Sequence, residues 1–222
     1  NYRNLTELAR SAALCNDSRL MKNTQRWVVE GDPMEGALLA FSGKASIDTI
    51  LEQNALPRID SIPFDAKHRF MATLHHIRND GAVIFVKGAP ESILAMCNSQ
   101  MTHRGDLAPL NTEYWIKQIN MAASRGQRIL AFATKNLNTQ QEKLTHLDMK
   151  SLTLLGMTGL IDPPRPEAIA AVAACKMAGI RVKMITGDHA KTACAIGEQI
   201  GLQNFHTVFT GHDLDNMTDA KL

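Results

Sequence analysis

The chain has 222 residues, of which 45% are hydrophobic and 21% are charged, a composition typical of a globular protein with one large or two small domains. Its formal net charge is only +2 and the basic residues are scattered, so the sequence argues against a nucleic-acid-binding surface. Four cysteines without CxxC spacing indicate a reduced compartment rather than a disulfide scaffold. No apolar stretch reaches the roughly 18 residues of a membrane span, and we expect the chain alone to be soluble.

The first part of the chain alternates between helical and strand-like patterns. A helix is predicted over Leu5–Leu14 with Asn4 as its cap, and a second helix begins at Asp32-Pro33-Met34-Glu35, which provides an N-cap, a proline at the first helical position and a capping-box glutamate. Further helices are predicted over Ile47–Gln53, Pro90–Cys97, Thr112–Arg125 and Thr139–Leu147, the last with Thr139 and Glu142 as a capping box. Strands are predicted over Trp27–Glu30, Arg58–Ile62, Phe70–Arg78, Ala82–Lys87 and Arg128–Lys135, with a hairpin turn at Asn79-Asp80-Gly81. These elements predict an α+β domain, an antiparallel sheet flanked by helices, over residues 1–151.

The pattern changes after Ser151. Strands are predicted at Leu152–Ile161, Ile180–Ile185 and Thr207–Thr210, and helices at Pro166–Ala178 and Ala190–Ile200. This is the order of a parallel, doubly wound sheet, so we expect a second, partial α/β domain over residues 152–222. Two helices cannot cover both faces of a parallel sheet. We therefore expect this domain to be truncated from something larger, and to form a dimer or a swapped pair through residues 152–222.

Three short motifs place potential phosphate-binding groups at predicted turns or at the starts of predicted helices. They are VKGAPE at Val86–Glu91, DPPR at Asp162–Arg165 and TGD at Thr186–Asp188. In the last motif, Thr186 offers a hydroxyl and Gly187 a close backbone approach, at the carboxyl end of a predicted strand and the start of a helix, where phosphate groups bind. The alternative is a plain turn in which Asp188 caps the next helix.

The other two motifs also have two interpretations. Lys87 closes a strand beside Gly88, which suits a purine or a phosphate, although a solvated surface lysine is the commoner case. In DPPR the two prolines stiffen the connection after a strand. Asp162 and Arg165 either clamp each other or orient a moving domain, and a rigid strand–helix turn is the simpler interpretation.

In this order and spacing, the three motifs resemble the P-type cation-transporting ATPases, and the resemblance covers nearly the whole chain. GDPxExAL and KGAPE together are characteristic of the type II group, which includes calcium pumps and sodium/potassium pumps. The other matching stretches are CNDS at Cys15–Ser18, EGDPMEGALL at Glu30–Leu39, PFDAKHRFM at Pro63–Met71, RIL at Arg128–Leu130, GLIDPPRPEA at Gly159–Ala168 and MITGDHAKTA at Met184–Ala193.

The resemblance implies a nucleotide-binding domain before DPPR, inserted into a haloacid-dehalogenase-like, Rossmann-type phosphorylation domain. Glu35 matches the glutamate that contacts the adenine amino group, and Phe64 matches the aromatic residue that stacks on adenine. Lys87, followed by Gly88, matches the lysine under the base. Arg128 matches the arginine that reaches the phosphates, where a guanidinium fork is favoured.

Two further sets of residues complete the implied site. Relatives often carry a basic residue where this chain has Ala66, and Lys67 or Arg69 is expected to replace it. In the phosphorylation part, the residues that match those around the phosphoryl group are Thr186, Gly187 and Asp188. The residues that match the interdomain hinge are Asp162, Pro163 and Arg165.

The resemblance implies that the full-length parent is an integral membrane enzyme with this chain on its cytoplasmic side. The parent would couple ATP hydrolysis, with Mg²⁺ and through an aspartyl phosphate, to cation transport. No DKTGT motif, whose aspartate would accept the phosphate, and no GDGxND motif, which would hold magnesium, occurs here. We therefore expect this part to bind ATP but to be inactive alone, with the transmembrane, actuator and remaining phosphorylation regions as its partners. The transported ion is not indicated.

Two other classes of function stay open at this point. A free-standing haloacid-dehalogenase-like phosphatase would need a DxD pair before the insertion, and none precedes residue 150. A non-catalytic nucleotide-sensing or interaction module is the third class.

Overall fold

The computed structural model describes residues 2–24, 26–77, 81–138, 141–162, 164–187, 190–211, 213 and 217–218. The predicted turn residues Asn79 and Asp80, the predicted cap Thr139, the hinge residue Pro163 and the site residue Asp188 lie outside these ranges. Within the ranges, no helix has the length and hydrophobicity needed to cross a membrane. The chain divides into two compact units, residues 1–114 with 129–158 and residues 115–128 with 159–222.

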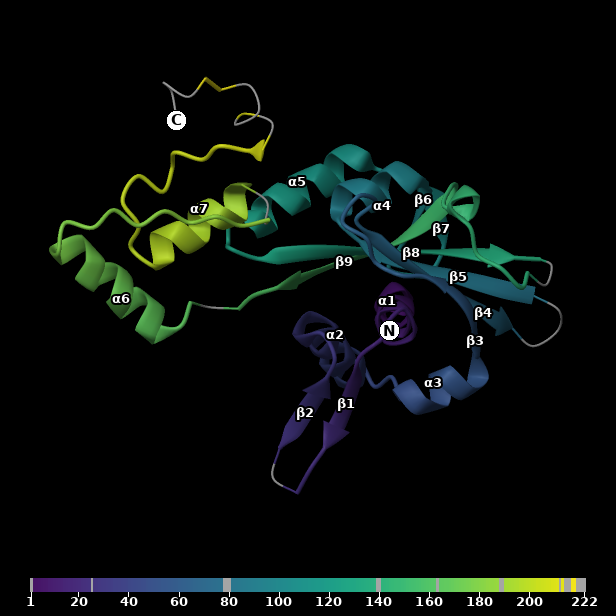
Figure 1. The fold of residues 1–222 in the computed structure, drawn as a ribbon. Coiled ribbons are helices and arrows are strands. Elements are labelled where there is room, and N and C mark those ends of the chain that lie inside the picture. Colours follow the sequence, from purple (N-terminus) through teal and green to yellow (C-terminus); the bar gives the residue numbers. More distant parts are fainter. Residues whose placement is uncertain are drawn as a thin grey trace. The chain divides into compact units, whose positions relative to one another are not determined.

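The first unit is built on a mixed, seven-stranded sheet. Its strands are β3 (Arg58–Ile62), β4 (Phe70–Ile77), β5 (Gly81–Gly88), β6 (Cys97–Met101), β7 (Leu107–Pro109), β8 (Arg128–Leu137) and β9 (Leu152–Leu160). Their order across the sheet is β3-β4-β5-β8-β9-β6-β7 (Figure 1). The strands β3, β4, β5 and β8 are antiparallel neighbours, whereas β6 pairs with β9 in parallel. The predicted α+β class is confirmed as a sheet flanked by helices, and the parallel pair is the difference from the predicted antiparallel sheet.

The helices of the first unit pack on this sheet or on one another. They are α1 (Arg3–Leu14), α2 (Pro33–Lys44), α3 (Thr49–Ala55) and α4 (Pro90–Met96). Figure 1 shows α1, α2 and α3 on one side of the sheet, with the two-stranded hairpin β1 (Arg19–Lys22) and β2 (Trp27–Glu30) projecting beside them. The predicted cap of the first helix is wrong, because α1 begins one residue before Asn4 and Tyr2 stands at its cap position without a side-chain bond.

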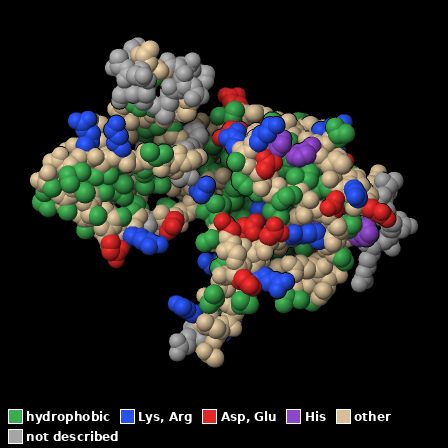
Figure 2. All heavy atoms as spheres, in the orientation of Figure 1, with side chains coloured by type: hydrophobic (Ala, Val, Ile, Leu, Met, Phe, Trp, Pro, Cys, Tyr) green, Lys and Arg blue, Asp and Glu red, His purple; other side chains and the backbone are tan. Residues whose placement is uncertain are grey.

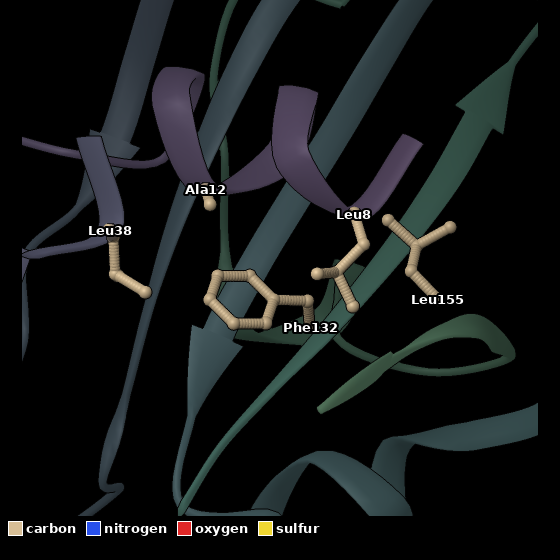
Figure 3. Packing of buried hydrophobic residues seen from close by; sticks show 5 residues of the cluster. All are labelled: Leu8, Ala12, Leu38, Phe132 and Leu155. Atoms are coloured by element: carbon tan, nitrogen blue, oxygen red, sulfur yellow. The ribbon is translucent and has the colours of Figure 1, made fainter. Parts of the chain in front are cut away.

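The core of the first unit lies between α1, α2 and the sheet. Phe132 of β8 is fully buried and packs with Leu8 and Ala12 of α1, Leu38 of α2 and Leu155 of β9 (Figure 3). Burial of one such large apolar side chain contributes about 1.5–3 kcal/mol. A second buried cluster, formed by Leu14, Cys15, Met71, Val83 and Phe85, fixes the end of α1 against β4 and β5.

The second unit contains most of α5 (Thr112–Ala123) together with α6 (Pro166–Met177) and α7 (Ala190–Gln199). The first turn of α7 is tied to the α5 region, since Lys191 Nζ lies 2.8 Å from Asn120 Oδ1 and Thr192 Oγ1 donates to the Gln127 carbonyl at 3.3 Å. In contrast, α6 has no buried residue. The predicted helices over 166–178 and 190–200 are confirmed, and Gly179 and Gly201 follow them with positive φ, as expected for helix ends.

Three predicted elements are wrong. Residues 180–185 and 207–210, expected to be strands, have no regular structure, and Ile185 is 98% exposed. A strand needs hydrogen-bonded neighbours, and β9, which was expected to begin a separate parallel sheet, instead pairs with β6 in the first unit. The predicted helix at Thr139–Leu147 is replaced, within its described part, by a 3₁₀ turn at His146–Asp148, where Thr145 and Asp148 form the capping box.

The predicted domain border at residue 151 differs from the division into compact units, because β9 follows that border and lies in the first unit's sheet. The apolar side chains of α6 are not buried, and Met177 is 83% exposed. A haloacid-dehalogenase-like arrangement of the second unit stays a prediction.

Candidate functional site

Glu35 is placed by the start of α2. Asp32 caps this helix, accepting hydrogen bonds at Oδ1 from the Met34 N–H at 2.8 Å and the Glu35 N–H at 3.2 Å, and Pro33 occupies the first helical position. The predicted capping-box role of Glu35 is wrong. Its Oε2 instead accepts from the Asp17 N–H at 2.9 Å and from Ser18 Oγ at 3.2 Å.

Lys87, which lies in the sheet, forms an ion pair with Glu35. It lies near the end of β5, is buried, and its Nζ donates to Glu35 Oε1. The two side chains are only 8% and 16% exposed, so the pair is held largely out of water, where opposite charges interact strongly. The structure thus brings together two residues that are distant in sequence and were both predicted to belong to one site.

The turn Cys15–Ser18, which follows α1, surrounds this pair on the helix side. Asn16 is buried, and its Nδ2 donates to the Ala12 carbonyl at 3.1 Å and to the Glu35 carbonyl at 3.0 Å. Arg58, the first residue of β3, donates to the Asn16 carbonyl at 2.6 Å. In the sequence, the turn was noted only because CNDS matches the family. Nothing near Arg58 in the sequence predicted its role, because its hydrogen-bond partners come from another part of the chain.

Two titratable side chains in the first unit, Cys15 and His75, are shielded from water. Burial raises the pKa of the Cys15 thiol, and the nearby Lys87 ammonium opposes that rise. Burial lowers the pKa of His75 to about 4. The ring is therefore neutral at physiological pH, although its contact with the Leu56 carbonyl at 2.8 Å favours the protonated form. Thr73 Oγ1 lies 2.9 Å from the other ring nitrogen.

Phe64 lies just after β3, at the end of the sheet where the carboxyl ends of β3 and β5 are found. The two strands run in the same direction because each is antiparallel to β4, and Ile62, Ala72 and Val86 are aligned across the three strands. Neighbouring strands are about 4.8 Å apart, so the chain near Phe64 leaves the sheet roughly 10 Å from the end of β5 at Lys87. The Phe64 side chain is 64% exposed, which leaves its ring free to receive a flat ligand.

At the same end of the sheet, the backbone at Gly88 lies close to the backbone at Arg69. The Arg69 carbonyl accepts from the Ala89 N–H at 2.9 Å, and a Cβ on Gly88 would lie 2.4 Å from that carbonyl oxygen. The glycine is therefore required by the close approach of the protein's own backbone. Ala66, Lys67 and Arg69 are all exposed, and which of the two basic residues replaces the expected one stays a prediction.

The remaining predicted site residues belong to the second unit. Arg128, at the start of β8, and Thr186 and Gly187 are exposed. Asp162 and Arg165 are exposed and both precede α6, with Arg165 at its N-cap position, and no ion pair joins these two described residues. The structure therefore does not contain the clamp considered for DPPR, and the phosphate-binding and hinge roles stay predictions. Among the residues that the structure describes, no group of three or more His, Cys, Asp and Glu side chains is arranged for a metal ion.

Comparison with known proteins identifies the family. Residues 4–167, which include Glu35, Phe64 and Lys87, match the family described as P-type ATPase, cytoplasmic domain N. The chain belongs to the P-type ATPase family. The matched P-type ATPase region is thus a cytoplasmic domain, and it contains the whole sheet of the first unit.

Individual P-type ATPases are similar to this chain over most of its length. A cation-transporting ATPase of Synechocystis is 43% identical over 98% of the chain and 24% of the relative. A probable cation-transporting ATPase F of Mycobacterium tuberculosis is 40% identical over 86% of the chain and 21% of the relative. A calcium-transporting ATPase of Listeria monocytogenes is 37% identical over 95% of the chain and 24% of the relative. The chain thus spans about a quarter of the length of these relatives.

Proposed function

We propose that this P-type ATPase domain binds ATP, with the adenine base beside Glu35 and Lys87. The observation that carries the proposal is the buried contact between these two side chains, one at the start of a helix and one at the end of a strand. The buried charge pair offers hydrogen-bonding groups to a purine, and the exposed ring of Phe64, roughly 10 Å away along the same end of the sheet, offers a stacking surface.

The hydrogen-bonding capacity of Glu35 suits adenine. An ionised carboxylate has about four acceptor positions. Among the described residues, Lys87, the Asp17 N–H and Ser18 Oγ donate to it, which leaves room for one more donor. The exocyclic amino group of adenine is such a donor, whereas guanine presents a carbonyl oxygen at that position and would be repelled.

The triphosphate would be bound by exposed cations, with Arg69, Lys67 and Arg128 as the proposed contacts. Exposed ion pairs contribute only about 0–1 kcal/mol each, and the adenine stack contributes about 1 kcal/mol. We therefore expect a weak site, with Kd from millimolar to high micromolar, on the order of −4 to −5 kcal/mol.

A titration with ATP, followed by NMR or calorimetry, tests the proposal. We expect saturable binding in the stated range, and Phe64→Leu should raise Kd roughly 5- to 10-fold because a base–aromatic stack is lost. Trp27→Leu is the matched control, because Trp27 is a comparably exposed aromatic on the β1–β2 hairpin. Nanomolar affinity, no binding at several millimolar ATP, or equal effects of both variants would contradict the proposal.

We further propose that the full-length parent is a membrane-bound, ATP-hydrolysing cation pump that works through an aspartyl phosphate with Mg²⁺. The names of the similar proteins, which include cation- and calcium-transporting ATPases, support this class of activity. The DKTGT aspartate is absent from these 222 residues, so this chain alone should release no phosphate from ATP above background. Steady turnover by the purified chain would overturn that expectation.

We also propose that residues 152–222 carry a self-association surface. Figure 2 shows hydrophobic side chains gathered on the face over α6. The exposed large hydrophobic residues of this part of the chain include Ile169 and Met177 in α6 and Ile180 and Ile185 after it. Burial of such side chains between two copies is favourable. Light scattering should detect a dimer that Met177→Lys weakens, and a monomer at high concentration would contradict this.

A further inference from the structure

We propose that Arg58 is a positioning residue of the nucleotide site, acting on Glu35 through the turn Cys15–Ser18. This inference rests on the proposed ATP-binding function. Arg58 itself does not contact Glu35. Its effect is transmitted by backbone groups that it holds in place.

The guanidinium of Arg58 binds the turn at three points. Its NH2 group donates to the Leu14 carbonyl at 3.0 Å and to the Asn16 carbonyl at 2.6 Å, and its NH1 group donates to Asp17 Oδ1 at 2.6 Å. The last carbonyls of a helix have no partner within the helix, so a cation at the end of α1 both satisfies them and opposes the negative end of the helix dipole. The rigid fork of an arginine suits several acceptors at once.

Bonds within the turn carry this restraint to Glu35. Asn16 links the turn to both helices through its Nδ2 bonds to the Ala12 and Glu35 carbonyls, and its Oδ1 accepts from the Ser18 N–H at 2.9 Å. As a result, the Asp17 N–H donates to Oε2 of Glu35, and the Ser18 hydroxyl lies 3.2 Å from that oxygen, the same distance as from its other acceptor, the Asp32 carbonyl. The arginine therefore controls two of the three donors that fix the carboxylate.

The third donor explains what happens when this restraint is lost. Lys87 holds the other oxygen of Glu35. Without the turn, the carboxylate would be free to turn both oxygens toward the ammonium, and the acceptor offered to an adenine amino group would be lost. The effect should be specific for the base, because the exposed cations proposed for the phosphates lie elsewhere. If Arg58 acted only in folding, its loss would weaken binding of the base and of the phosphates equally.

The test compares Arg58→Ala with Arg10→Ala. Arg10 is a matched control: it also extends from the α1 region to another element, through bonds to Glu7 at 2.7 Å and Glu52 at 2.9 Å, and its side chain is 28% exposed against 31% for Arg58. Each protein is titrated with ATP and with inorganic tripolyphosphate. We expect Arg58→Ala to raise the Kd for ATP about tenfold, the effect of losing one or two hydrogen bonds to a charged group, with the Kd for tripolyphosphate unchanged. Arg10→Ala should change neither.

A second variant covers the case in which Arg58→Ala does not fold. Ser18→Ala removes one donor to Glu35 directly and should raise the Kd for ATP about threefold, without affecting tripolyphosphate, as expected for one net hydrogen bond. The inference is overturned if ATP binds the wild type but binds the folded variants equally well, or if the variants lose both ligands in parallel. Absence of ATP binding by the wild type itself would instead overturn the proposed function, and the inference with it.

Discussion

A lysine and a glutamate that are both nearly removed from water depend on each other. Lys87 and Glu35 form such a pair across the boundary between β5 and α2. Each charge compensates the other for the water it has lost, so removing one partner costs more than the contact itself is worth. The pair therefore joins the proposed ligand site to the stability of the first unit.

This dependence gives a prediction for single and double variants. Lys87→Met should lower the free energy of unfolding by about 3 kcal/mol, because it leaves a buried carboxylate without its cation. The double variant Lys87→Met/Glu35→Gln should recover part of this loss. Urea unfolding of the four proteins in a double-mutant cycle measures the coupling. A loss below about 0.5 kcal/mol, the size of an ordinary surface effect, would contradict the buried pair.

His75 makes the stability depend on pH. Its pKa in the folded protein is about 4, because burial disfavours the charged ring, against about 6.5 when unfolded. The unfolded chain therefore binds the proton first, and stability falls as pH drops from 6.5 to 4, by about 3 kcal/mol in total.

The contribution of His75 is isolated by comparing variants. Unfolding curves of His75→Gln should lose most of this pH dependence, whereas His103→Gln, at an exposed position, should keep the wild-type profile. Parallel pH profiles for wild type and His75→Gln would rule out a buried neutral ring.

At the scale of elements, the cap of α2 directs Glu35. Asp32 accepts two N–H groups of the first turn, and its loss should cost about 1 kcal/mol. Asp32→Ala should therefore shift the urea midpoint, while Asp32→Asn, which keeps an acceptor, should stay within a few tenths of a kcal/mol of wild type. Equal shifts for both variants would show that charge, and not capping, matters at this position.

Two glycines in neighbouring elements should respond in opposite directions to alanine. At Gly88 a Cβ would meet backbone atoms of Arg69 and Phe70 at 2.4 and 2.8 Å, whereas at Gly43 in α2 it would meet nothing within 4 Å. Gly88→Ala should thus destabilise the protein by about 1–3 kcal/mol, and Gly43→Ala should stabilise it by about 0.5 kcal/mol. Thermal unfolding of both variants tests the strand contact directly.

The elements that could be predicted from the sequence are those with local signals. Asp32-Pro33 before α2 and the glycines after α6 and α7 mark helix ends, and the apolar run over residues 82–86 marks the strand β5. The polar strand β6, Cys97–Met101, was missed because it has no apolar pattern and because one of its two partner strands, β9, is distant in sequence. For the site, Glu35 and Lys87 were predicted to lie together, but Arg58 and the turn it holds depend on contacts that no local pattern contains.

At the scale of the whole molecule, the absence of strands over 180–185 is a testable property. Hydrogen exchange should find the Arg181–Ile185 amides exchanging at rates close to those of an unfolded chain. Those of β4 and β5, buried and paired on both sides, should open only with global unfolding. Strong protection over 181–185 would restore the parallel strand that the sequence predicts.

The position of β9 has a consequence for synthesis on the ribosome. The strands β6 and β7 are made before β8 and β9, yet in the finished sheet those two later strands separate them from β5. A nascent chain that has reached only residue 151 would therefore hold two incomplete pieces of sheet with open edges, which invite pairing between chains. Release from the ribosome or a proteolytic cut just before Leu152 should accordingly yield aggregates, because the strand that closes the gap is the last one to arrive.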